Sequence, residues 1–287
     1  MATREMGPPC SGFNPVSEPT QKPDAEITPL EAVRPPGKAM GFWDHLNELR
    51  GVLFRSALAF IAAAVVVGIY FKDFFDALSW PLNHVLSEYP DLTFRFVTNS
   101  PMEGFNVIIQ LCLVGGLIMS SPFILFFIGQ FIAPALTDHE RRTVLPFVGV
   151  GLLLFLSGSA FSFFLLVTSA LRVSIDLNLL FGWGFNWTPA NYFSLMTWLV
   201  LGVGLSFEFP LVIVLLVHFR LMTTAFLRKY RKHAIIVIFI IAAIVTPTPD
   251  PLTQGLMALP LYVLFELAII AGSRIEKKRA ARLAAGV

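Results

Sequence analysis

The sequence predicts an all-α integral membrane protein with six transmembrane helices. Hydrophobic residues make up 55% of the 287 positions and charged residues only 14%, whereas about a quarter of an ordinary soluble domain is charged. Mean hydropathy is +0.71. Charge-free apolar stretches recur along the chain, and most of the basic residues fall between them on alternate sides. A soluble protein is therefore excluded.

The net charge of +2 gives no indication of a nucleic-acid partner, and two cysteines are too few for a disulfide framework or a structural zinc site. No phosphate-binding loop, nucleophile site or metal-ligand spacing occurs in the sequence. We therefore expect no catalytic residues, no metal and no cofactor, and an enzyme is not favoured.

The chain opens with a segment that has no apolar run. Residues 1–40 hold eight of the 20 prolines, and this composition predicts a disordered cytoplasmic tail. No secretory signal pattern indicates its removal. Residues 41–50 follow, with Trp43, Leu46 and Leu49 on one helical face. They predict an amphipathic helix that runs into the first span, either as a plain interfacial anchor or with a further role.

Six apolar stretches follow, and about 20 residues suffice to cross a hydrocarbon core of about 30 Å. They cover residues 56–71, 104–137, 143–171, 177–207, 233–249 and 251–265; the fourth continues past Glu208 to residue 219, and the last continues past Glu266. The apolar part of the fifth, residues 234–245, is only about 18 Å long as a helix. Pro260 interrupts the sixth. We therefore predict two short C-terminal spans, in a thinned bilayer or covered by partner helices.

The basic residues predict the orientation. With six spans, 18 of the 21 Lys and Arg residues lie on the side of the termini, and Lys72, Arg95 and Arg172 lie on the other. Basic loops stay in the cytoplasm, so both termini are expected there. Residues 41–272 form the predicted membrane domain and residues 273–287 a basic cytoplasmic tail.

A few charged residues are candidates for function. Glu208 lies inside the fourth span, where a carboxyl group should be neutral or paired. Its role could be functional, or it could bond the backbone carbonyl that Pro210 frees. Glu266 has the same ambiguity. Asp250 follows four alternating Thr and Pro residues, 246–249, and is expected to cap a turn. Glu140 lies in a short charged loop that could simply set the topology.

Several strings together resemble one family, TatC, the multispanning subunit of the twin-arginine protein translocase. The resemblance covers residues 41–272 in order. The strings are His45-Leu-x-Glu48-Leu49-Arg50, Ser100-Pro101-x-Glu103-x-Phe105, Phe131-x-x-Pro134-x-Leu136-x-x-x-Glu140-Arg141, Phe155-x-x-Gly158-x-x-Phe161, Phe207-Glu208-x-Pro210, and Thr246 to Asp250.

The resemblance implies a receptor for signal peptides of folded cargo. In this family the glutamates that correspond to Glu48 and Glu140 bind the paired arginines of the signal peptide. Arginine presents a fork of donors that pairs with a carboxylate, and lysine does not reproduce this fork. Arg50, Phe131 and Arg141 are expected to shape the pocket.

The resemblance also implies partners and a location. Glu208, on a concave membrane-facing surface of a glove-like bundle, and the polar Thr246 and Gln254 would contact the single-span proteins TatA and TatB. The receptor complex would be homo-oligomeric, lie in the bacterial cytoplasmic (inner) membrane and be driven by the proton gradient. Residues expected to have structural or transport-related roles are Pro81, Glu103, Pro210 and Asp250.

The alternative function is a proton-coupled small-solute transporter that uses Glu208 as a relay. Transporters of that kind usually contain internal repeats with interrupted helices in matching positions. No convincing pairing relates residues 41–157 to residues 158–272. An intramembrane hydrolase lacks its nucleophile.

Overall fold

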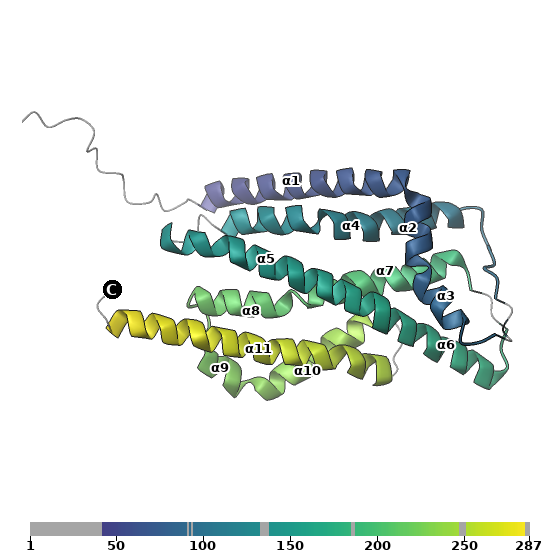
Figure 1. The fold of residues 1–287 in the computed structure, drawn as a ribbon. Coiled ribbons are helices and arrows are strands. Elements are labelled where there is room, and N and C mark those ends of the chain that lie inside the picture. The colour runs from purple at the N-terminus through teal and green to yellow at the C-terminus, as the bar shows by residue number, and fades with distance from the viewer. Residues whose placement is uncertain are drawn as a thin grey trace, which may run out of the picture. The chain divides into compact units, whose positions relative to one another are not determined.

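A computed structural model of the chain describes residues 42–90, 92, 94–132, 138–184, 187–246 and 251–284. For residues 42, 44, 45, 138–144 and 282–284 it describes the backbone alone. The described part is helical, and its longest connection, residues 87–102, joins α3 to α4 (Figure 1). Its helices are α1 (Phe42–Ile69), α2 (Phe71–Leu78), α3 (Trp80–Leu86), α4 (Glu103–Ile132), α5 (Asp138–Phe161), the π-helix η2 (Ser162–Leu166), α6 (Val167–Phe181), α7 (Pro189–Ser206), α8 (Phe209–His218), α9 (Thr224–Lys229), α10 (Arg231–Val245) and α11 (Pro251–Ala284).

The predicted all-helical membrane fold is confirmed. Five helical segments of the described chain are long and apolar enough to cross a membrane: Leu46–Ile69, Glu103–Ile132, Leu145–Phe181, Pro189–His218 and Pro251–Ala281. The fifth predicted span coincides with α10, whose 15 residues extend only about 22 Å. The count of six spans therefore stays a prediction, and α10 is the segment on which it depends.

The predicted boundary between the third and fourth spans is wrong, because the helix of the third span ends at Phe181. Residues 177–181 end the third helix instead of beginning the fourth, because α5, η2 and α6 follow one another without a break up to Phe181. Gly182, with φ of 67°, then ends α6 in the left-handed conformation that glycine adopts most easily. The next long helix begins after Thr188, whose hydroxyl accepts a hydrogen bond from the Asn191 amide at 3.2 Å.

The prediction of two short C-terminal spans is also wrong for the second of them. α11 runs for 34 residues with Pro260 inside it. As predicted, the helix continues past Glu266, whose carboxylate pairs with Arg231 of α10 at 2.8 Å. The helix then continues through residues 273–284 of the basic segment. Only α10 is short.

The helix ends define two ends of the bundle. At one, which we call the basic end, α1 and α5 begin and α4, α8 and α11 end; at the other, the far end, α2 and α3 lie, α6 ends and α7 begins (Figure 1). Arg50, Arg228, Lys229 and the cations late in α11 belong to elements at the basic end. Lys72 and Arg172 belong to elements at the far end. The structure thus gathers most of the described basic residues at one end.

Small residues allow α5 and α7 to approach closely. A Cβ atom added at Gly158 of α5 would lie 2.6 Å from Cγ of Phe207, and one added at Gly204 of α7 would lie 2.6 Å from Oγ of Ser159. Small residues at helix contacts are typical of membrane bundles. Gly158, Ser159 and Gly204 therefore have a packing role in this contact.

Two hydrophobic clusters surround this contact. One joins α7, α8, α10 and α11 around Val203, Met257 and Phe265, and the other joins α3, α4, α6 and α7 around Leu111, Phe193 and Met196. Fully buried side chains in both clusters hold the long helices together. The bundle therefore provides a fixed frame for the helix ends.

Polar contacts tie the loop after α3 to α6 at the far end. Arg172 donates to both carboxylate oxygens of Glu88, at 2.8 and 2.6 Å, and Tyr89 donates to Asp176 at 2.6 Å. The hydrogen bond from Arg172 lowers the pKa of Glu88. The bond to Asp176, with some burial, raises the pKa of Tyr89 to about 12. Arg172, one of the three cations expected on this side, is therefore paired.

Candidate functional site

Three helix ends meet where the predicted signal-peptide residues lie. The beginning of α1, the end of α4 and the beginning of α5 lie together at the basic end (Figure 1). α1 and α4 run antiparallel, and a Cβ atom at Gly116 of α4 would lie 3.1 Å from Cβ of Ala64. Sixteen residues before Ala64 is Glu48, and sixteen residues after Gly116 is Ile132. This register places Glu48 level with the end of α4.

One carboxylate oxygen of Glu48 has no hydrogen-bond donor among the described residues. The residue is half-buried, and its Oε2 atom has no solvent contact and no hydrogen-bond partner in the described part of the chain. Leaving such an atom without a donor costs roughly 1–3 kcal/mol, more when it is charged. Arg50, two residues further on, is exposed. The site therefore contains a carboxylate oxygen that a charged donor would satisfy.

The other predicted members of this site lie on α4 and α5. Phe131 is half-buried in the last turn of α4. Glu140 and Arg141 lie in the first turn of α5, where an acidic residue is favoured by the helix dipole. Their side chains are outside the described residues. The chain thus brings Glu48, Phe131 and the backbone of Glu140 to one end, across a connection of only five residues, 133–137.

Glu208 lies at the break between α7 and α8. Pro210, which is buried, is the second residue of α8, and it lacks the amide hydrogen that a continuous helix would use. Oε1 of Glu208 has no solvent contact and no described hydrogen-bond partner. Oε2 faces α5, 3.2 Å from where a Cβ atom at Gly151 would lie. The bond to a freed carbonyl that would make Glu208 structural is not found among the described residues.

An apolar cavity of about 300 Å³ adjoins Glu208. α4 provides most of one wall, α8 most of the other, and Phe155 of α5 contributes between them. Glu208 is the only ionisable group in its lining. We call this cavity, lined by Leu117, Ser121, Ile124, Leu125, Ile128, Ile132, Phe155, Leu205, Glu208, Leu211, Val212 and Leu215, the Glu208 cavity.

The contacts of Glu266 differ from those of Glu208, although both glutamates lie within apolar stretches of the sequence. Its carboxylate accepts from Arg231 at 2.8 Å and from the Tyr262 hydroxyl at 3.2 Å. The ion pair joins α10 to α11. Glu266 is therefore a structural residue.

The remaining predicted residues have local bonds. The Thr246 hydroxyl, which is buried, donates to the Ala242 carbonyl at 2.8 Å, and the Gln254 amide donates to the Phe239 carbonyl at 3.2 Å. Glu103 is 8% exposed and accepts from the Asn99 amide at 3.2 Å. Pro81 is buried at the start of α3. Asp250 lies outside the described residues.

Some features could not be found by sequence motifs. Gly151 is one of many glycines in apolar helices, and only its contact with Glu208 distinguishes it. Arg172 was noticed as a rare cation of the far side, but its pairing with Glu88 depends on a contact across 84 residues. No cluster of three metal-binding side chains occurs among the described residues.

The comparisons with known proteins agree on one family. The sequence profile of the Sec-independent protein translocase protein (TatC) family matches residues 44–260. A TatC from Aquifex aeolicus is 34% identical over 84% of this chain and 98% of its own length. One from Akkermansia muciniphila is 38% identical over 63% of this chain, which spans about half of that relative.

Solved structures show the same likeness. The crystal structure of a twin-arginine translocase receptor TatC in DDM matches with a TM-score of 0.68 and 35% identity, over 79% of this chain and 99% of that one. The comparisons give no support to a small-solute transporter.

Proposed function

We infer, from the fact that this chain belongs to the TatC family, that it serves the twin-arginine translocase as the receptor for signal peptides. As a TatC protein it is a non-enzymatic membrane component of protein transport. The observation that carries the receptor role is the half-buried carboxylate of Glu48, whose Oε2 is shielded from solvent and has no protein donor in the described part of the chain.

An arginine side chain of the cargo satisfies this oxygen. Its guanidinium is always charged and offers parallel N–H donors that match a carboxylate. At a membrane interface the lower dielectric strengthens the pairing relative to water. Glu140, in the first turn of α5 at the same end of the bundle, supplies the second carboxylate for the second arginine. Arg50, Phe131 and Arg141 border the site.

The proposed topology has six spans and both termini in the cytoplasm of a bacterium, with the protein in the cytoplasmic (inner) membrane. The gathering of basic residues at one end supports it, because such residues stay on the cytoplasmic side. The receptor site at the basic end would then face the compartment in which cargo is made.

We further propose that TatA and TatB bind at the Glu208 cavity and at the ends of α10 and α11. A half-buried carboxyl group in an apolar cavity favours a partner helix that carries a polar group at that depth. Gln254 and Thr246 mark the second contact, although both already bond to backbone carbonyls. The receptor complex contains several copies of this chain, and the proton gradient drives transport.

The receptor role is tested by peptide binding to the purified protein. Glu48→Arg places a cation where the peptide arginine binds, so affinity for a twin-arginine peptide should fall by at least about tenfold, given roughly 1.5–3 kcal/mol for a charge-assisted hydrogen bond. Glu140→Arg should act in the same way. Asp73→Asn is the matched control, because it removes a carboxylate from the exposed face of α2 at the far end. Undiminished binding by a folded Glu48→Arg protein would exclude Glu48 from the site.

A further inference from the structure

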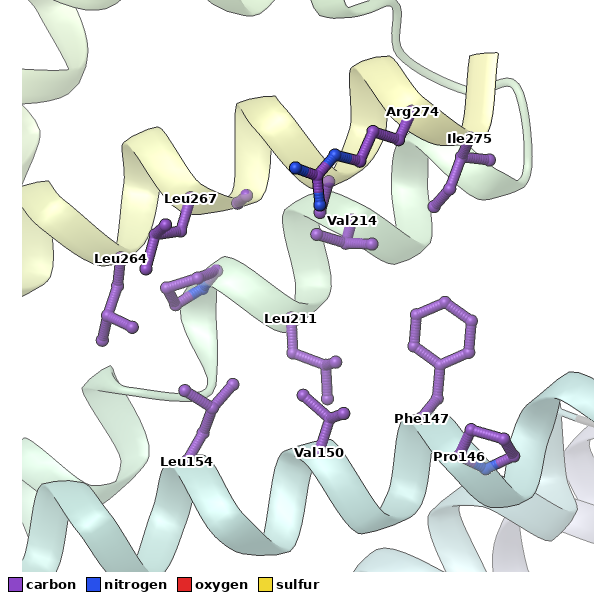
Figure 2. A pocket seen from close by; sticks show the side chains of 13 residues that line it. Pro146, Phe147, Val150, Leu154, Leu211, Val214, Leu264, Leu267, Arg274 and Ile275 are labelled. Atoms are coloured by element: carbon purple, nitrogen blue, oxygen red, sulfur yellow. The ribbon is translucent and has the colours of Figure 1, made fainter. Parts of the chain in front are cut away.

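A second apolar groove, of about 520 Å³, runs between α5, α8 and α11 (Figure 2). The side chains that line it are Pro146, Phe147, Val150, Leu154, Pro210, Leu211, Val214, Leu264, Leu267, Ala268, Ala271, Arg274 and Ile275. Arg274 is the only ionisable group among them. The groove therefore has an apolar floor and a single charge.

The charge lies at one end of the groove. Leu154 and Leu264 lie together at one end, and Phe147 lies with Ile275 and Arg274 at the other (Figure 2). The latter is the basic end, because α5 begins and α11 ends there. From Leu264 to Ile275 the helix rises about 16 Å, close to half of a hydrocarbon core of about 30 Å. The groove has the length of one leaflet.

The cation at that end is available for a ligand. Arg274 is exposed and has no acidic partner among the described residues. Lys278 is exposed one turn later on the same face of α11. The nearby acid Glu276 is already bonded to the amide and the hydroxyl of Thr224, and Arg228 bonds to Ser273 at 2.9 Å. Among the described side chains, the positive charge at this end of the groove is therefore not compensated by an acid.

We propose that this groove binds an anionic phospholipid, with an acyl chain between α5 and α11 and the phosphate on Arg274 and Lys278. The apolar lining matches a hydrocarbon chain, and the two cations match the charge of the headgroup. The proposal does not depend on signal-peptide binding.

The test is native mass spectrometry of the purified full chain, titrated in detergent with dioleoyl phosphatidylglycerol or dioleoyl phosphatidylcholine. The wild-type protein should bind the anionic lipid more tightly. Arg274→Gln should weaken binding of phosphatidylglycerol about fivefold, the factor that corresponds to about 1 kcal/mol per basic residue at an anionic surface. Lys232→Gln, which removes an exposed cation from α10 outside the groove, is the matched control and should leave binding unchanged.

A second variant tests the apolar part. Ala271→Phe fills the groove without changing charge, so it should displace the phosphatidylglycerol adduct while tryptophan fluorescence reports an intact fold. Equal affinity of wild-type protein and Arg274→Gln for phosphatidylglycerol would overturn the proposal. So would equal weakening by Lys232→Gln, or disulfide crosslinking of Leu267→Cys to a single-span partner helix in native membranes.

Discussion

Replacing Gly158 by alanine tests the close contact of α5 with α7. The added Cβ atom would lie 2.6, 2.9 and 3.0 Å from Cγ, Cβ and Cδ1 of Phe207. Carbon atoms pack at about 3.5–4.0 Å, so the ring or the helix must move by about 1 Å. Phe207 is only 6% exposed, and its ring lies 6.0 Å from that of Phe161. The Cβ atom of Phe207 is fixed to the backbone, so a change of side-chain rotamer cannot relieve its contact.

Overpacking of this kind costs about 1–3 kcal/mol. Gly149 in the same helix is the matched control, because a Cβ atom there meets nothing within 4 Å. Both substitutions gain the same roughly 0.5–1 kcal/mol from the better helix propensity of alanine. The difference between the two variants is therefore the packing cost alone, about 1–3 kcal/mol.

The assay is reversible unfolding of the purified variants in mixed micelles, followed by tryptophan fluorescence. We expect Gly158→Ala to be less stable than Gly149→Ala by that amount. Equal stabilities, or a more stable Gly158→Ala, would show that α5 does not pack closely against Phe207 at this glycine.

Three further predictions concern charged residues. Glu208→Leu should abolish export of a twin-arginine reporter in cells, while the purified variant still binds the signal peptide. Normal export by this variant would show that the Glu208 carboxyl group is not required for transport. Arg231→Gln leaves Glu266 without its cation and should lower the free energy of unfolding by about 1 kcal/mol, since the pair is partly exposed; an unchanged denaturation midpoint would count against the pair. Arg172→Gln should destabilise the protein at neutral pH, because the ion pair with Glu88 contributes only while that carboxyl is ionised. The difference in unfolding free energy between the variant and wild type should therefore disappear as pH falls below 4.5 through the lowered pKa of Glu88. A difference that persists unchanged at low pH would contradict this assignment.

The sequence predicts most of the fold because lipid imposes simple requirements. Long apolar stretches must be helices and cations must collect outside the hydrocarbon, so the helical bundle and the basic end follow from residue order. The turn after α6 cannot be located from charge, because no charged residue marks it. Gly182 ends the helix through its backbone conformation, and the uncharged, mostly apolar residues 177–181 continue up to that point.

The candidate site could be predicted only where a motif names its residues. Glu208 and Glu266 are both carboxyl groups in apolar helices, and sequence cannot separate them. The partner of Glu266 lies 35 residues away on another helix, whereas Oε1 of Glu208 has no described partner. The groove at Arg274 cannot be predicted from the sequence either, because it forms only where three helices pack together.

The central claim is that carboxylates at the basic end recognise paired arginines. The most direct measurement is the affinity of the purified protein for a twin-arginine signal peptide and for the same peptide with both arginines changed to lysine. Net charge is equal in the two peptides, but lysine cannot pair bidentately with Glu48. We predict at least about tenfold weaker binding of the lysine peptide, as roughly 1.5–3 kcal/mol per charge-assisted bond requires. Equal affinities would contradict the account.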